Sequence, residues 1–351
     1  MSLNKYATFD DLYEKHLILE QQLSGFESKR QRTIYNDINP LIRSLEVFYL
    51  VKMLRYQCEL ISRNQVLGIP CKGFDDLLIQ YETDEELLKN EYVSTFILVY
   101  KTLSAKDVTT CRYYYQKLNS RIKSLIHSAK INFGHEVISY IINVCLYWNN
   151  CGDRKFGAEY LQWIDYKTEH RMLPENGGYL QPITFRNAIL LGLDGHRSDS
   201  WISAFINRYQ PLLPPDVKDA NTAFVKAVWS YHQKAYEKAL PLFQLATVKK
   251  EPVFNVISRR WQFMCMYDSQ KISAGILIDF LSAFEKYLSR NRKALLPAFQ
   301  PCMAFIGYSR HLLKLSAASK QKFINQLQQE AHFPGKQWLL AAALNEIIRR
   351  P

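Results

Sequence analysis

The stretch from residue 221 to residue 252 constrains the fold of this chain most, because apolar residues recur there at helical spacing twice in succession. The first apolar face has intervals of three, one and three residues and consists of Phe224, Ala227, Val228 and Tyr231. The second has intervals of four and three residues and consists of Ala239, Phe243 and Ala246. Each set falls on one side of a helix. A short polar turn at residues 232–236 separates them, so the stretch predicts a helix hairpin.

The hairpin resembles a tetratricopeptide repeat. That family combines an aromatic-x-x-small-small-x-x-Tyr helix with an Ala-x-x-x-Phe-x-x-Ala helix over ~34 residues. The stretch departs from the pattern at Phe224, where the family prefers Trp, and at Val228, where it prefers Gly. Pro241 also lies inside the second helix, where its ring disfavours helical backbone. The resemblance implies an array of helix pairs, and an isolated helical hairpin is the alternative.

Helical periodicity continues through the rest of the chain, with short connections between segments. Strands look scarce, because Gly and Pro are both low at 13 residues each and there are no alternating Val/Thr-rich runs. We therefore predict an all-α fold of stacked antiparallel helix pairs that form a right-handed TPR-like α-solenoid. We predict a single continuous array over residues 1–351, with a soft boundary near 172–181. The expected helices are 9–23, one with Pro40 in its first turn that ends near 68–70, 74–81, 83–103, one after Asp107, 137–148, 155–169, one from Pro182, 198–212, the hairpin, 253–267, 274–289, 302–315, 317–329 and 337–348.

The pattern also predicts which side chains are buried. In the segment 41–60, the expected buried stripe is Leu41, Leu45, Phe48, Tyr49, Met53, Tyr56 and Leu60. Across the whole chain, the expected interior includes Phe48, Tyr92, Ile141, Phe205, Phe243 and Phe284.

Composition and cysteine usage indicate the class of protein. The chain has 351 residues, of which 48% are hydrophobic, enough for an extensive core. Its seven cysteines show no C-x-x-C pair, which favours buried free thiols in a reducing compartment. The first residues lack the apolar region of a signal peptide. The most apolar run, 137–148, is shorter than the roughly 20 residues of a membrane span. We expect a soluble cytoplasmic protein with no membrane partner.

The charge of the chain is unevenly distributed. The formal net charge is +12, and residues 201–351 carry all of it, with 21 basic and 9 acidic side chains. Such asymmetry attracts an acidic partner or nucleic acid. The alternative is a solvated basic surface without a dedicated ligand.

A second resemblance rests on two further segments. The run Leu173-Pro174-Glu175-Asn176-Gly177-Gly178-Tyr179-Leu180, then Thr184-Phe185-Arg186-Asn187, then Trp201 to Ile206 and Leu212-Leu213-Pro214-Pro215, resembles a group of uncharacterised helical-repeat proteins from Bacteroidetes-type bacteria. Residues 54–60 are similar to an upstream segment of the same group. The resemblance covers most of residues 40–300. It implies a tetratricopeptide-like fold, carries no catalytic residues to transfer, and predicts that this chain is short at its N-terminus.

The motifs of catalysis and metal binding are absent or incomplete. His135-Glu136 is not followed by the second His of H-E-x-x-H, and neither G-x-x-x-x-G-K-[ST] nor G-x-G-x-x-G occurs. Residues 192–200 bring Ser, His and Asp close in sequence. A triad, however, requires a nucleophile on a tight elbow, and the stretch instead predicts a helix end followed by a Ser/Asp N-cap. We predict no metal and no cofactor.

The favoured hypothesis is a non-enzymatic scaffold that binds a protein or peptide, possibly acidic, in a concave groove formed by residues 216–293. The alternative is an RNA-binding module that uses the basic C-terminal half. An undetected hydrolase at residues 194–200 is a third hypothesis, and the oligomeric state is left open. The predicted partner contacts are Lys226, Lys234, Arg259, Arg260, Arg290 and Arg292.

Overall fold

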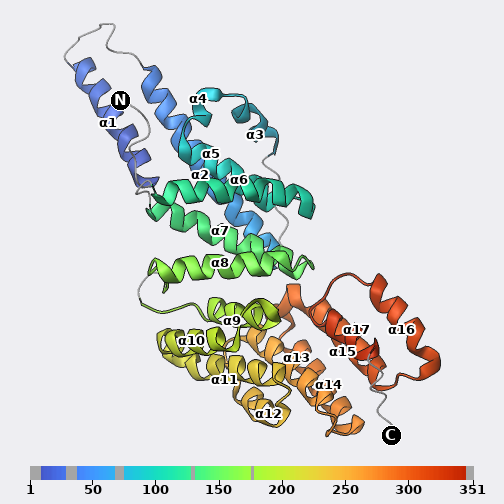
Figure 1. The fold of residues 1–351 in the computed structure, drawn as a ribbon. Helices are drawn as coiled ribbons and strands as arrows, with labels where there is room; N and C mark the ends of the chain where they lie inside the picture. The colour runs from blue at the N-terminus through green and yellow to red at the C-terminus, as the bar shows by residue number, and fades with distance from the viewer. Residues whose placement is uncertain (1–8, 29–37, 68–74, 128–130, 175–177, 345–351) are drawn as a thin grey trace. The chain divides into compact units, whose positions relative to one another are not determined.

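The computed structural model describes residues 9–28, 38–67, 75–127, 131–174 and 178–344. These residues form helix after helix and contain no strand, so the predicted all-α class is confirmed (Figure 1). The chain divides into two compact units, Met1–Phe156 and Gly157–Pro351, called unit 1 and unit 2. The prediction of one continuous solenoid stays a prediction.

Unit 1 is built from helices that pack mainly on their neighbours in the chain. Helix α2 packs on α1 and α5, α5 on α6, and α7 on α6, α5 and α2. The large side chains at the centre of unit 1 include Tyr92, Phe96 and Ile141, each almost completely buried. The helices are α1 (Phe9–Ser28), α2 (Asn39–Leu67), α3 (Asp75–Glu82), α4 (Glu85–Leu88), α5 (Glu91–Ser104), α6 (Val108–His127) and α7 (Ile131–Asn150).

The long helix expected over residues 83–103 was wrong, because the structure splits it into α4 and α5 at Asn90. The Asn90 side chain accepts hydrogen bonds from the backbone N–H groups of Tyr92 (3.0 Å) and Val93 (3.2 Å), which makes it the N-cap of α5. Asp84 caps α4 in the same way. Side chains of this kind compete with helical backbone bonds and favour helix starts. The cap expected at Asp107 is confirmed, since its carboxylate accepts from Thr110 N at 2.8 Å.

The buried stripe predicted for α2 was also wrong. Leu45, Tyr49, Tyr56 and Leu60 are exposed, and Phe48 is half-buried against Tyr13 of α1. The opposite face of the helix lies in the core, through Val47, Leu50, Val51, Leu54, Cys58 and Ile61. Because α2 is apolar on both faces, periodicity alone did not distinguish the core side.

In unit 2, too, the helices pack mainly on helices that are near them in the chain. Helix α11 packs on α9 and α12, α13 on α12 and α14, and α15 on α14, while α17 packs on α15 and α16. The predicted starts at Lys155, Pro182, Ala274 and Ala317 are confirmed. The helices are α8 (Lys155–Glu169), whose first two residues belong to unit 1, α9 (Pro182–Leu191), the π-helical turn η2 (Gly192–His196), α10 (Asp199–Tyr209), the 3-10 turn η3 (Gln210–Leu212), α11 (Pro215–His232), α12 (Tyr236–Leu245), α13 (Pro252–Asp268), α14 (Ala274–Arg290), the 3-10 turn η4 (Arg292–Leu295), α15 (Leu296–Leu313), α16 (Ala317–Gln329) and α17 (Lys336–Leu344).

The hairpin predicted around residues 221–252 forms as α11 and α12. Ala227 and Ala239 are fully buried, and such small side chains permit a close approach of the two helices. The Phe224 ring lies 6.3 Å from the Phe243 ring of α12 and 5.5 Å from the Phe254 ring of α13. Phe224 therefore fills the space between this pair and the next helix. Of the six side chains expected inside, all but half-buried Phe48 are buried.

A polar joint holds α9 against α11 and the start of α13. Arg186 on α9 is buried, and its guanidinium donates to the Asn221 side-chain oxygen on α11. It also lies 3.7 Å from the Glu251 carboxylate and above the Phe254 ring. Asn221 in turn donates to Val217 O at 2.7 Å. Burial lowers the pKa of Arg186, and a buried cation of this kind depends on such partners.

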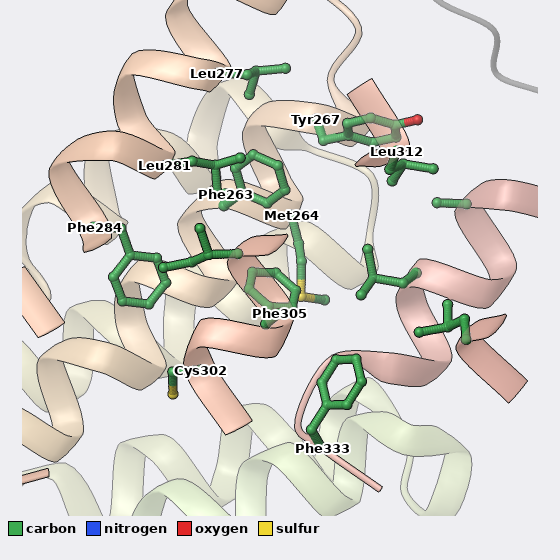
Figure 2. Close-up of a cluster of buried hydrophobic side chains, with 14 of the residues drawn as sticks. Phe263, Met264, Tyr267, Leu277, Leu281, Phe284, Cys302, Phe305, Leu312 and Phe333 are labelled. Carbon is green, nitrogen blue, oxygen red and sulfur yellow. The ribbon is translucent and has the colours of Figure 1, made fainter. Parts of the chain in front are cut away.

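An aromatic cluster forms the core of the C-terminal part of unit 2 (Figure 2). The Phe263 ring lies 5.8 Å from Phe305 of α15 and 5.9 Å from Trp338 of α17. The Trp338 indole N–H donates to the Asp268 carboxylate at 3.0 Å, and the Tyr231 hydroxyl donates to the same oxygen. Helices α11, α13, α15 and α17 thus meet at one site.

The described cysteines are free thiols, as expected. Cys58, Cys111, Cys145, Cys265 and Cys302 are buried, and Cys151 is exposed. Burial raises the pKa of Cys265 to about 12 and also raises the pKa of Cys302. Cys71 lies outside the described residues.

The turn before α17 requires glycine at residue 335. Gly335 has a φ of 95°, and a Cβ atom there would lie 2.7 Å from two ring carbons of Phe305. We predict that Gly335→Ala lowers the free energy of unfolding by ~2–3 kcal/mol, through backbone strain and steric overlap. Urea unfolding followed by tryptophan fluorescence measures this. Gly195→Ala is the matched control, because Gly195 has a φ of 94° with nothing within 4 Å. Equal losses in the two variants would contradict the predicted overlap.

Lys167 on α8 is buried, and desolvation lowers its pKa to about 8. Between pH ~8 and the usual pKa of ~10.4, the unfolded chain binds more protons at this residue than the folded chain. The cost of burying the charge is therefore complete below pH 8 and disappears as the pH rises toward 10.4. We predict that the free energy of unfolding of wild type, measured against Lys167→Met, rises by up to ~3 kcal/mol between pH 7 and pH 10. Unfolding curves of both proteins at the two pH values test this, and a constant difference between them would contradict the prediction.

Candidate functional site

A hollow opens between α15 and α16 in unit 2. Its volume is ≈ 740 Å³, within the range of about 300–1,000 Å³ typical of ligand pockets. Several of its side chains are exposed, so the hollow is open to solvent. It is lined by Ala304, Gly307, Tyr308, Arg310, His311, Lys314, Gln326, Gln329 and Glu330.

The sequence of α15 explains why the helix leaves space on this side. Ala304, Gly307, His311 and Lys314 follow one another at intervals of three, four and three residues, so they share one face of the helix. The first two are small, and a Cβ atom added to Gly307 would meet nothing within 4 Å. The small residues Ala304 and Gly307 therefore leave space in the hollow. His311 and Lys314 follow them on the same face of α15.

The other face of α15 anchors it in the core. Phe305 and Ile306 are buried, and Figure 2 shows Phe305 among the aromatic and aliphatic side chains of the cluster. Across the hollow, Phe323 of α16 is buried and lies 5.9 Å from the Tyr308 ring and 6.2 Å from the His311 ring. Tyr308 also stacks on Phe333, at 5.9 Å. These aromatic contacts set the separation of the two helices.

Hydrogen bonds orient two of the polar groups in the lining. Arg310 donates to the Glu285 carboxylate of α14 at 2.6 Å. The Tyr308 hydroxyl donates to the Glu330 carboxylate at 2.7 Å, and both residues line the hollow. Burial, helped by Glu330, raises the pKa of Tyr308 to about 12, so the hydroxyl stays protonated at neutral pH. These two bonds fix the Arg310 guanidinium and the Tyr308 hydroxyl in place.

Lys314 differs from Arg310, because it is exposed and has no ion-pair partner among the residues that the structure describes. It lies at the far end of the floor of the hollow, one helical turn beyond His311. With two amides from α16, the lining can donate hydrogen bonds to a polar backbone and attract a carboxylate. The apolar floor and the rings suit a small side chain beside that carboxylate.

The predicted partner contacts occupy several places in unit 2. Lys226 is exposed on α11, and Lys234, with a φ of 58°, lies in the turn before α12. Arg290 is exposed in the last turn of α14. Arg292 is exposed in η4, with its guanidinium 5.1 Å from the Phe299 ring centre. That these residues contact a partner stays a prediction.

The adjacent Arg259 and Arg260 point to different neighbours. Both are half-buried, and burial lowers the pKa of each. The Arg259 guanidinium lies 4.7 Å from the Tyr287 ring centre on α14. The Arg260 side chain instead approaches Gly335, with its Cδ 3.4 Å from a Cβ built at that glycine. The two arginines therefore do not line one surface together.

The Ser, His and Asp of residues 192–200 are arranged at a helix start. Ser198 Oγ accepts from Trp201 N at 3.4 Å, so the predicted N-cap is confirmed. The Asp199 carboxylate accepts from the Trp229 indole N–H at 2.8 Å and from the Gln233 amide at 3.3 Å. The His196 side chain lies outside the described part of the chain. Within that described part, no group of three or more His, Cys, Asp or Glu side chains is placed to hold a metal ion.

Comparison with protein families, curated proteins and solved structures adds no relative. No family model, no curated protein and no solved structure matches this chain. Among the described helices, none combines the length and the apolar character needed to cross a membrane.

The hollow was not predicted from the sequence, because the candidate contacts were selected by their positive charge. The available signal was the stripe Ala304, Gly307, His311 and Lys314, in which two small residues precede two basic ones on one helix face. Small residues at this spacing are also common where helices pack closely. Only the position of α16 shows that the space beside them is open.

We predict that Gly307→Ala stabilises the protein by about 0.5–1 kcal/mol, because alanine has the higher helix propensity and the added methyl group meets no atom. Thermal unfolding measures the gain. Gly192→Ala is the contrasting variant: its Cβ would lie 2.7 Å from Ile202 Cδ1, so Ile202 must shift, and this variant should be less stable than Gly307→Ala. A loss of stability in Gly307→Ala would show that the face is covered in solution.

Proposed function

We propose that the protein is a non-enzymatic scaffold of TPR-like helix pairs that binds a protein or peptide partner through an acidic segment. The observation that carries the proposal is the hollow between α15 and α16. Small residues, the Tyr308 ring and basic side chains line it. Arrays of helix pairs present extended concave surfaces of the kind that accept such segments.

The shape of the hollow supports a peptide as the ligand. Its ≈ 740 Å³ would hold a few side chains of an extended segment. Gln326 and Gln329 on α16 offer amide groups that pair with a peptide backbone, while the Tyr308 and Phe323 rings offer apolar contact. This mixture suits a short segment of polypeptide.

The charge distribution supports an acidic partner. Arg310 and Lys314 lie in the lining, and the region 201–351 carries 21 basic against 9 acidic residues. A field of that sign raises the association rate of an acidic ligand. Lys314 is the residue that we expect to pair with a carboxylate, since Arg310 is already bonded to Glu285.

The test is a selection of displayed random peptides on the full-length protein, followed by fluorescence anisotropy with the selected peptides. We expect enrichment of peptides that contain Asp or Glu. Their dissociation constant should rise at least 10-fold in Lys314→Glu, which reverses the charge, and in Gly307→Leu, which fills the floor. Both changes lie on an exposed helix face, so the circular dichroism spectrum should not change.

Lys322→Glu is the matched control, because Lys322 is exposed on α16 and does not line the hollow. Lys226→Glu tests the surface predicted from sequence, and loss of binding in that variant alone would move the site to α11. Failure to select any peptide, or equal affinity in Lys314→Glu and wild type, would overturn the proposal. Strong salt-dependent shifts of mixed RNA would instead favour the nucleic-acid alternative.

A further inference from the structure

Helix α2 carries a second apolar face, which stays about half exposed in the part of unit 1 that the structure describes. Its core face packs within unit 1, whereas the opposite face consists of large apolar side chains that are 44–57% exposed. We call these residues the outer stripe: Ile38, directly before the helix, and Ile42, Leu45, Tyr49, Tyr56 and Leu60. Isolated exposed apolar residues are ordinary, but a contiguous row of them marks an interaction surface.

The spacing of the outer stripe is that of a coiled-coil seam. Its members follow at intervals of four, three, four, seven and four residues, and Lys52 occupies the position inside the interval of seven. Alternation of threes and fours keeps a row facing one partner helix when the two helices wind around each other. From Ile38 to Leu60 the row is about 33 Å long at the rise of an α-helix. A second helix is therefore the shape that fits it.

We propose that the outer stripe is the interface of a homodimer, in which α2 of one copy packs antiparallel against α2 of another. The solvent-facing side of a helix is usually polar, and α2 departs from that rule. Six large side chains, each about half exposed, offer on the order of 600 Å² per copy. Two such surfaces bury on the order of 1,200 Å², above the roughly 1,000 Å² expected of a specific interface.

Charge selects the antiparallel orientation. In a parallel, in-register pair, Lys52 of each copy would face Lys52 of the other, and like charges repel. In an antiparallel pair with its two-fold axis near the middle of the stripe, Lys52 fits between Ile42, Leu45, Glu46 and Tyr49 of the other copy, so it lies beside the Glu46 carboxylate. Glu46 is partly exposed, at 43% of its side chain, and is bonded to Arg43 at 2.8 Å. Symmetry forms the Lys52–Glu46 pair twice.

Sedimentation analysis of the full-length chain tests the interface. We expect wild type to be a dimer at high micromolar concentration. Leu45→Glu and Tyr49→Glu should each raise the dimer dissociation constant at least 10-fold, with helical content unchanged because neither side chain is in the core. Ile79→Glu is the matched control: Ile79 is 61% exposed on α3, outside the stripe, and this variant should remain dimeric.

A charge exchange tests the orientation. Lys52→Glu and Glu46→Lys should each weaken the dimer, and the double variant should recover most of the wild-type affinity, because it restores the pair with the charges reversed. A monomeric wild type would overturn the proposal, and so would a dimer that persists in Leu45→Glu and Tyr49→Glu. A double variant no tighter than the single variants would overturn the antiparallel arrangement.

Discussion

The Asp268 carboxylate holds the C-terminal part of unit 2 together. One of its oxygens accepts hydrogen bonds from the Tyr231 hydroxyl of α11 and the Trp338 indole of α17. Bonds from neutral donors to a carboxylate are stronger than bonds between neutral groups. The Trp338 ring, fixed in this way, completes the cluster around Phe263 and Phe305. Because α15 and α16 both pack on α17, the geometry of the hollow depends on the contacts of Asp268.

Much of the fold could be predicted from the sequence, because helical periodicity and capping are local properties. The starts of α8, α9, α14 and α16 and the caps at Asp107 and Ser198 all followed from nearby residues. The errors arose where a local signal was overruled or ambiguous. Asn90 caps a new helix inside an apolar run, and its competing hydrogen bonds were not recognised. In α2, both apolar faces have the spacing of a buried helix face. Only the packing of α1, α5 and α7 against α2 determines which of the two is in the core.

The candidate site was less predictable, for a different physical reason. A hollow exists where side chains are small and the neighbouring helix stays distant, and neither condition follows from the composition of one segment. The predicted contacts followed from the excess of positive charge after residue 200, and they included Arg259 and Arg260. In the fold, such an arginine covers an adjacent aromatic ring, as Arg259 covers Tyr287, because cation–π contact and burial of the aliphatic stem favour packing. Lys314 was missed because nothing near it in the sequence singles it out.

The buried thiols give this protein its own reporters of local opening. A thiol reacts through its thiolate, and burial both hides the sulfur atom and raises its pKa, so each buried cysteine becomes reactive only when the surrounding structure opens. Cys58, Cys111 and Cys145 belong to unit 1, while Cys265 and Cys302 belong to unit 2. The rate at which each is alkylated under native conditions therefore reports the opening that exposes it within its own unit. Native cysteines alone allow the cooperativity of the two units to be compared without any introduced label.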